Sequence, residues 1–228
     1  MLPSVYVWPA ATQTAIFNSF NIPPVPGQRS FVLNGDLFNQ ASPPGSPISL
    51  GNISRVISIT SAGNVSGVNF TITGTYNGLP VSQTIAGPNA TTVYTTQFFS
   101  TVTSVTFNAN VASATNIGTG VAGVAPAAAW GVTNWFRYDY HATFASLAIQ
   151  AQVNAATANY SFEVTLDDVT IIPEGSLTLI NPIGAMTNAT TNQLGSLGYP
   201  IRYARIKFNN ATTGAGALTA TFIQQGVR

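Results

Sequence analysis

The sequence contains no cysteine and few charged residues. Its 228 residues include seven Lys or Arg, six Asp or Glu and one His, and 6% are charged. An ordinary soluble domain has about 25% charged residues. The lack of cysteine excludes disulfides and thiolate metal sites. The net charge of +1 gives no electrostatic reason to expect nucleic acid or an anionic membrane as a partner.

Long apolar runs are absent as well. The longest apolar stretch, residues 120–130, is too short to span a bilayer and contains Pro126. The first twenty residues lack the basic region and the uninterrupted apolar region of a signal peptide. We therefore expect the protein to be made in a cytoplasm and not to be exported by the usual route.

Thr, Ser, Asn, Gln and Gly fill the polar positions of the sequence. Such side chains hydrogen-bond to water and to protein at a modest desolvation cost, whereas burying a charge costs far more unless it is paired. A surface of this kind suits contact with other protein over large areas. The composition therefore favours a component of an assembly over an enzyme.

Apolar and polar residues alternate with a period of two from Ile53 onward. This alternation, as in Val68, Phe70 and Ile72, is typical of half-buried strands. Asn77-Gly78 supplies the positive φ values of a tight hairpin turn. Further strands are expected over residues 81–85, 92–97, 101–107, 115–118, 135–140, 144–153, 160–166, 177–179, 201–208 and 217–225. The pattern predicts an all-β protein, a jelly roll or β-sandwich that forms one large or two small sandwiches.

Prolines are dense in residues 1–47, which prevents long helices and central strands there. The segment also carries large apolar residues, which a disordered tail would lack. We expect an extended N-terminal arm that buries them on a neighbouring subunit, and an irregular first strand pair of the same domain explains the pattern equally well. The stretch of small residues at 121–129 predicts a boundary between two sandwich parts, residues 48–125 and 126–228. Alternatively, the two parts form one continuous domain.

Catalytic and metal-binding patterns are weak in this sequence. The single histidine, His141, lies beside aromatic residues and lacks the serine context of a catalytic triad. Asp167 and Asp168 are adjacent, so on a strand they would point to opposite faces, and we expect them to cap a strand at a turn. Paired carboxylates can serve glycoside hydrolysis. Asp167, Asp168 and Glu163 therefore make a carbohydrate-active enzyme the third functional hypothesis, after the two given at the end of this subsection. We expect no enzyme activity, no cofactor and no metal.

Aromatic and arginine side chains are the main candidates for contacts with partners, because both are enriched where proteins meet. Isolated arginines in a charge-poor chain often tie subunits or loops to carbonyl oxygens and carboxylates. The aromatic residues could instead stack on sugar rings. The predicted interface residues are Trp8, Phe17, Phe20, Phe31, Arg55, Trp135, Arg202 and Arg205.

Two stretches resemble a recurring pattern in the virion proteins of tailed bacteriophages. In residues 53–106, an Arg-led strand precedes the sequences SAGN, FTITGT, TIAGPN and FFSTVTSV. Residues 160–226 run from YSFEVTLDDV to YPIRYARIKFNNATTGAGALTATFIQQG. The resemblance implies a virion structural component, such as a head decoration or cement protein or a tail-associated protein. Cement proteins of this kind are often β-sandwich or jelly-roll trimers on the capsid lattice, and the family has no catalytic residues to assign.

The resulting hypothesis is a non-enzymatic capsid decoration or cement protein, made in the host bacterial cytoplasm and located on the outer capsid surface of the virion. Its expected partners are the major capsid protein and other copies of itself, in a homotrimer, with no nucleic acid and no membrane. Many weak contacts, repeated by symmetry, would staple neighbouring capsid subunits through avidity. The alternative is a tail-associated or receptor-binding virion protein that recognises host glycan.

Overall fold

The structure is a computed structural model, and it describes residues 4–8, 16, 48–50, 53–120, 130–138, 147–155, 159–209 and 216–224. In these ranges the chain forms 16 β-strands and two 3-10 helices, and all strand pairs are antiparallel. The all-β prediction is therefore confirmed. Neither helix in this part of the chain has the length and apolar character that a membrane span requires.

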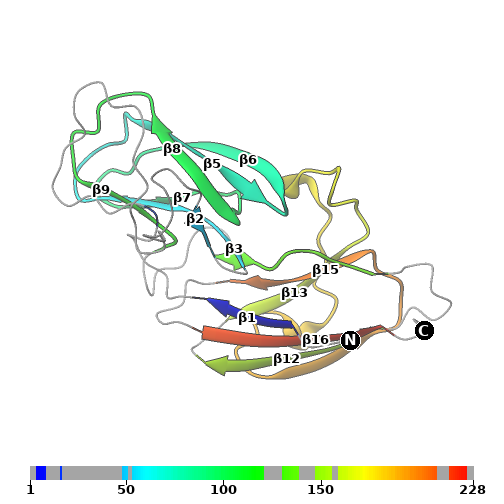
Figure 1. Cartoon of the computed structure of the whole chain (residues 1–228). Coiled ribbons are helices and arrows are strands. Elements are labelled where there is room, and N and C mark those ends of the chain that lie inside the picture. The colour runs from blue at the N-terminus through cyan, green and yellow to red at the C-terminus, as the bar shows by residue number, and fades with distance from the viewer. Residues whose placement is uncertain are drawn as a thin grey trace.

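The first sandwich contains the strands from Ile48 to Gly118, apart from β3 (Figure 1). One of its sheets has the strand order β2-β8-β5-β6 and the other has the order β7-β4-β9. The strands are β2 (Ile48–Ser49), β4 (Ser58–Ser61), β5 (Asn69–Tyr76), β6 (Leu79–Ala86), β7 (Thr92–Tyr94), β8 (Thr101–Phe107) and β9 (Thr115–Gly118). Apolar side chains of both sheets, including Ile59, Ile72 and Val105, form one core between them.

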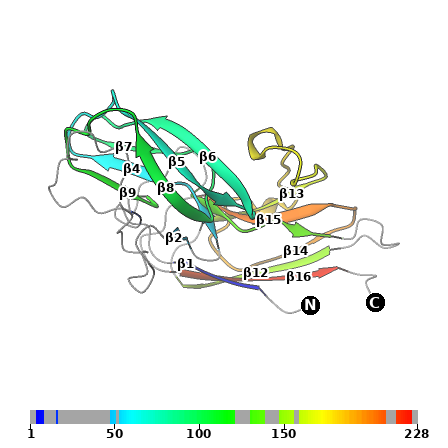
Figure 2. The same ribbon diagram turned by 45° about the horizontal axis from the view of Figure 1, so that its top comes forward.

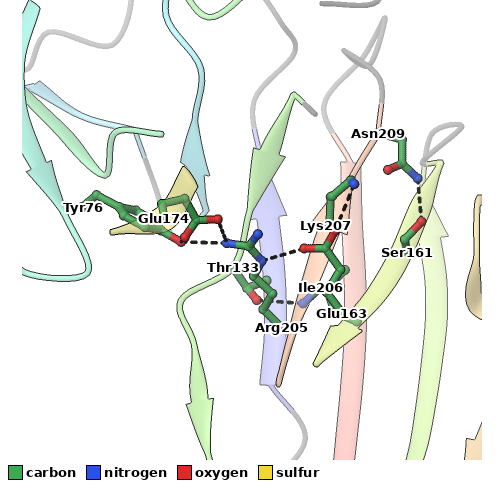
Figure 3. Close-up of polar contacts among 9 residues, drawn as sticks. All are labelled: Tyr76, Thr133, Ser161, Glu163, Glu174, Arg205, Ile206, Lys207 and Asn209. Carbon is green, nitrogen blue, oxygen red and sulfur yellow. Dashed lines mark hydrogen bonds and ion pairs between the residues drawn. The ribbon is translucent and has the colours of Figure 1, made fainter. Parts of the chain in front are cut away.

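The β5–β6 hairpin follows the sequence pattern closely. Phe70 and Ile72 are buried in the core, and Thr71 and Thr73, which alternate with them, face outward. The turn residues Asn77 and Gly78 have φ angles of 50° and 78°, as the sequence predicted. The turn end of this hairpin points toward the other half of the chain and brings Tyr76 to the junction of the two halves (Figures 1 and 3).

The second sandwich holds the remaining strands around a core that includes Trp130, Phe162 and Phe222. One sheet has the order β1-β16-β12-β14, and the other has the order β11-β15-β10-β3 with β13 also paired to β15. The strands are β1 (Ser4–Trp8), β3 (Ser54–Arg55), β10 (Gly131–Val132), β11 (Phe136–Arg137), β12 (Leu147–Ala155), β13 (Tyr160–Thr165), β14 (Gln193–Leu197), β15 (Tyr203–Phe208) and β16 (Gly216–Gln224). The 3-10 helices are η1 (Glu174–Ser176) and η2 (Gly184–Met186).

The short strand β3 joins the two sandwiches. On one side Arg55 pairs with Gly131 of β10 in the second sandwich. On the other side its backbone exchanges two hydrogen bonds of 2.8 Å with Phe99, a core residue of the first sandwich. The two sandwiches lie on either side of this strand (Figure 1), and Figure 2 shows the same two groups of strands from another direction. A two-residue strand thus connects the two cores through the backbone.

Part of the predicted N-terminal arm lies in the fold. Residues 4–8 form β1, an edge strand that pairs with β16 from Ser4–Ala220 to Trp8–Gly216. This arrangement agrees with the alternative of a strand in the same domain. Ile16 is fully buried in the first core, and its N–H donates to the carbonyl of Ile117. The rest of residues 1–47 and the predicted boundary at 121–129 lie outside the described residues, so there the arm and the boundary stay predictions.

The segment between β13 and β14 differs from the sequence-based expectation. The strand predicted over residues 177–179 is wrong, because Thr178 N–H donates to the carboxylate of Asp167 instead of to a neighbouring strand. The next residue, Ile180, makes an isolated bridge to Val164, and Ala189 makes another to Tyr160. The unpredicted strand β14 pairs with β12 in its place. The long connection from residue 166 to residue 192 is therefore held by two backbone bridges to β13, by side-chain contacts and by two short 3-10 helices.

Candidate interaction site at the junction of the sandwiches

A buried cluster of charged residues lies between the two sandwiches. Arg205 of β15 is only 2% exposed, and its Nε donates to Oε2 of Glu163 at 2.8 Å. Its Nη1 lies 2.6 Å from Oε1 of Glu174 and 2.9 Å from the hydroxyl oxygen of Tyr76 (Figure 3). Glu163 and Arg205 face each other because they are register partners in the β13–β15 pair. Tyr76 comes from the first sandwich, so this cluster links the two halves.

The cluster contains two acidic and two basic residues. Lys207 Nζ lies 2.9 Å from Oε1 of Glu163 and completes the set. Burial alone would lower the pKa of Arg205, but the neighbouring Tyr76, Glu174 and Glu163 together raise it above its ordinary value. Burial raises the pKa of the Tyr76 hydroxyl, which therefore stays protonated and donates to Glu174 at 3.3 Å. The chemical role of the cluster is to satisfy buried charges, each with a partner.

Aromatic rings cover the guanidinium of Arg205. Its Cζ lies 4.3 Å from the centre of the Trp135 ring and 5.8 Å from that of Phe98. Cation–π contacts of this kind are strongest when they are shielded from water. Trp135, predicted as an interface residue, thus contacts the cluster from the outside and is itself half-buried.

A second ion pair fixes the start of the 166–192 connection. Arg202 Nη2 lies 2.5 Å from Oδ2 of Asp168, and the two side chains are 27% and 21% exposed. Oδ1 of Asp168 accepts hydrogen bonds from the backbone and hydroxyl of Thr170, and these bonds lower the pKa of Asp168. Asp167 and Asp168 thus hold a turn after β13, as predicted. With Glu163 inside the buried cluster, the three acids considered for glycoside hydrolysis all make contacts that hold the fold.

Arg55 is fully buried, and its Cζ lies 4.8 Å from the centre of the Trp130 ring. Burial lowers the pKa of Arg55 to about 10. Arg205 therefore ties together parts of one chain through two carboxylates, the second of the two roles predicted for isolated arginines, and Arg55 packs on Trp130. Their side chains do not reach the surface of the described structure, where another subunit would meet them.

The other predicted interface residues are Trp8, Phe17, Phe20 and Phe31. Trp8 is placed in β1, but its side chain lies outside the described residues, as do Phe17, Phe20 and Phe31. Their predicted roles stay predictions. Sequence reasoning missed the roles of Tyr76 and Glu174 in the buried cluster. One signal could have found Glu174: in a chain with so few charges, a buried acidic residue needs a basic partner.

A hollow adjoins the charged cluster where the β5–β6 turn meets the 166–192 connection. It consists of two adjoining cavities of about 310 and 220 Å³, and we call their combined space the junction hollow. The larger cavity is lined by Asn77, Leu79, Asn134, Trp135, Val169, Thr170 and Tyr203. The smaller one shares four of these residues and adds Tyr76, Pro80, Val81, Gln97, Ile171, Ile172, Pro173 and Glu174. Leu79 and Ile171 are 51% and 77% exposed, so large apolar surface lies at its edge.

The outer face of the β8-β5-β6 sheet carries a regular array of hydroxyl groups, which we call the hydroxyl face. Thr71 and Thr84 are joined by a hydrogen bond of 2.7 Å, and Thr75 and Thr101 by one of 2.8 Å. The array consists of Thr71, Thr73 and Thr75 on β5, Ser82 and Thr84 on β6, and Thr101, Ser104 and Thr106 on β8. No charged residue occurs in the sequence between Arg55 and Arg137. The first sandwich therefore has an uncharged surface throughout its described part.

Charged residues contribute little to the described surface. Those described are Arg55, Arg137, Glu163, Asp167, Asp168, Glu174, Arg202, Arg205 and Lys207. Of these nine, Arg137 alone is classed as exposed. Within the described ranges, no group of three or more His, Cys, Asp or Glu residues is placed to hold a metal ion.

Comparison with known proteins gives no family for this chain. No family model and no curated protein matches it. Among solved structures, a protein from Parabacteroides distasonis ATCC 8503, whose description proposes that it is secreted, aligns over 98% of this chain and 100% of its own. The identity is 9% and the TM-score is 0.24, so this likeness carries no argument about fold or function.

Proposed function

We propose that this protein is a non-enzymatic structural component of a tailed-bacteriophage virion, a decoration or cement protein on the outer surface of the capsid. In this role it binds the major capsid protein and other copies of itself, as a homotrimer, and staples neighbouring capsid subunits. The observation that supports this most is the nearly charge-free surface, since eight of the nine described charged residues are buried or half-buried.

The chemistry of the hydroxyl face fits a protein partner. Hydroxyl groups both donate and accept hydrogen bonds, so they can pair with a partner's backbone or side chains with little desolvation cost. A charged partner surface would meet no opposite charge on the described part of the first sandwich, so no ion pair would offset the cost of removing its water. Uncharged contacts of this kind depend weakly on salt and gain strength by repetition across a symmetric lattice.

A single charge placed on the hydroxyl face tests this function. Thr84→Lys puts an ammonium into the uncharged array, and Gln152→Lys, at an exposed position on β12 of the second sandwich, is the matched control. We expect Thr84→Lys to weaken co-sedimentation with empty capsids at least about tenfold, the effect of about 1.4 kcal/mol. The control should bind as the unmodified protein does. Equal binding by both variants would show that the hydroxyl face does not contact the capsid.

The finer features of the proposal are a jelly-roll arrangement and an N-terminal arm that enters grooves on the capsid. Deleting residues 1–40 would test the arm poorly, because it also removes β1 and the buried Ile16. A sharper variant keeps residues 1–16 and replaces residues 17–47 by a Gly/Ser linker of equal length. It should fold but fail to decorate capsids. A folded wild-type protein that ignores capsids and adsorbs to host cells would favour the alternative, a tail protein that recognises glycan.

A further inference from the structure

The junction hollow has the features of a peptide-binding surface. Its lining is mostly apolar, and the aromatic side chains of Trp135, Tyr203 and Tyr76 form part of its walls. Leu79 and Ile171 leave large apolar surface exposed at its edge. Isolated exposed apolar residues are common, but a group of them around a concave site marks a contact surface.

The charged side chains near the hollow are already paired with other residues of the same chain. Glu174, which lines the smaller cavity, is paired with Arg205. Asp168, next to the lining residues Val169 and Thr170, is paired with Arg202. An occupant that carried a charge would therefore lose water without gaining a free ionic partner. The hollow favours an uncharged, apolar segment.

Proline-rich segments fit surfaces of this type. They are extended before binding, so little conformational entropy is lost, and they dock into grooves lined by aromatic side chains. The chain itself contains such a segment at Pro23-Pro24-Val25-Pro26, a P-x-x-P sequence with the apolar residues Phe20 and Ile22 before it. Its nearest charged residue is Arg29.

The length of chain around this segment allows it to reach a neighbouring molecule. Residues 17–47 begin after Ile16, which is buried in the first core, and end at Ile48 of β2. At about 3.3–3.6 Å per residue, these 31 residues have an extended length of about 100 Å. A loop that leaves and returns to the first sandwich can therefore extend roughly 50 Å at its middle. This distance exceeds the diameter of a small domain, about 30 Å.

We propose that the junction hollow binds the Pro23–Pro26 segment of a second copy of this chain. The segment lies against Trp135 and Tyr203, and Leu79 and Ile171 close over its apolar side chains. This inference rests on the proposed function and deepens it, because it identifies how copies of the protein hold one another in the assembly. It assigns the predicted arm a docking site on the described structure.

The test is a titration with a synthetic peptide of residues 17–30. The receptor is the full chain with Pro23, Pro24 and Pro26 replaced by Ala, so that its own segment does not compete, and tryptophan fluorescence reports binding. The site variant Leu79→Glu and the control Ile223→Glu replace two residues of similar exposure, 51% and 55%, one at the hollow and one on β16. We expect saturable binding that Leu79→Glu weakens at least about tenfold and that Ile223→Glu leaves unchanged.

Three results would overturn the inference: no binding of the peptide, equal binding of a peptide without its prolines, or an equal effect of both Glu variants. Sedimentation velocity of the full chain then shows which copy supplies the segment. A concentration-dependent oligomer that both Leu79→Glu and the proline replacement dissociate supports a second copy, and a monomer at all concentrations excludes it. Capsid binding is scored separately: peptide binding without capsid binding overturns the proposed function alone, and capsid binding without peptide binding overturns this inference alone.

Discussion

Replacing Arg205 tests whether the buried charged cluster holds the sandwiches together. Arg205→Met keeps much of the side-chain volume but removes one of the partners of Glu163 and of Glu174, which are 3% and 14% exposed. Removing one member of a buried ion pair costs about 3–5 kcal/mol, because the remaining charge is left in a poorly solvated place. For a chain of this size about 1 kcal/mol changes the melting temperature by about 2–4 °C. The expected fall is therefore about 6–20 °C.

The matched control is Arg202→Met, because Arg202 also pairs with a carboxylate but is 27% exposed. A partly exposed pair contributes far less to stability than a buried one, so this variant should melt within about 4 °C of the unmodified protein. Thermal unfolding at neutral pH, followed by far-ultraviolet circular dichroism, measures both. The double variant Arg205→Met/Glu163→Gln should lose less than the sum of the two single changes. Equal small losses for Arg205→Met and Arg202→Met would refute the role given to the cluster.

Two further predictions concern the packing and the pH response of the fold. In Gly74→Ala the new Cβ would lie 1.9 Å from the carbonyl oxygen of Thr101, so we expect the free energy of unfolding, measured in urea, to fall by about 1–3 kcal/mol or more. Gly67→Ala is the control, because nothing lies within 4 Å of the added carbon. Similar losses in both variants would contradict this packing. Burial raises the pKa of Tyr160 to about 12, above the ordinary value of 10, so its contribution to stability is complete below pH 10 and is lost as the pH rises toward 12. Tyr160→Phe should therefore lose less stability than the unmodified protein between these pH values, and parallel losses would show that the hydroxyl is not buried as described.

Strands that are buried on one face were the easiest to predict. The alternation at Phe70 and Ile72 and the expected strand over residues 81–85 lie in β5 and β6, because alternation directly reflects a core on one side and solvent on the other. The expected strands 101–107 and 115–118 also coincide with β8 and β9. The Asn77-Gly78 turn was predictable for a similar local reason, the positive φ values that it needs. Two-residue strands such as β3 and β10 are too short to show a period. They form because the two sandwiches meet there, which depends on residues far apart in the sequence.

The candidate site was predicted only in part. Trp135, Arg202 and Arg205 were predicted as interface residues, and the structure shows the contacts that they make within the chain, whose partners the sequence did not identify. Arg205 meets Tyr76, 129 residues away, because the β5–β6 turn reaches the second sandwich. Sequence distance hides a contact of this kind until the strand order is known. The junction hollow was missed for the same reason, since its walls come from the β5–β6 turn, the residues before β11, the start of β15 and the segment after β13.

The most direct test of the proposed function is sedimentation of the unmodified protein with empty capsids of the virus that encodes it, over about 0.05–0.5 M salt. We expect saturable co-sedimentation of a trimer, with an affinity that changes little across this range, because the described surface offers few charges for ionic contacts. A protein that stays in the supernatant with capsids present at every salt concentration would contradict the function. Binding that is lost as salt rises would contradict the uncharged contacts on which the account depends.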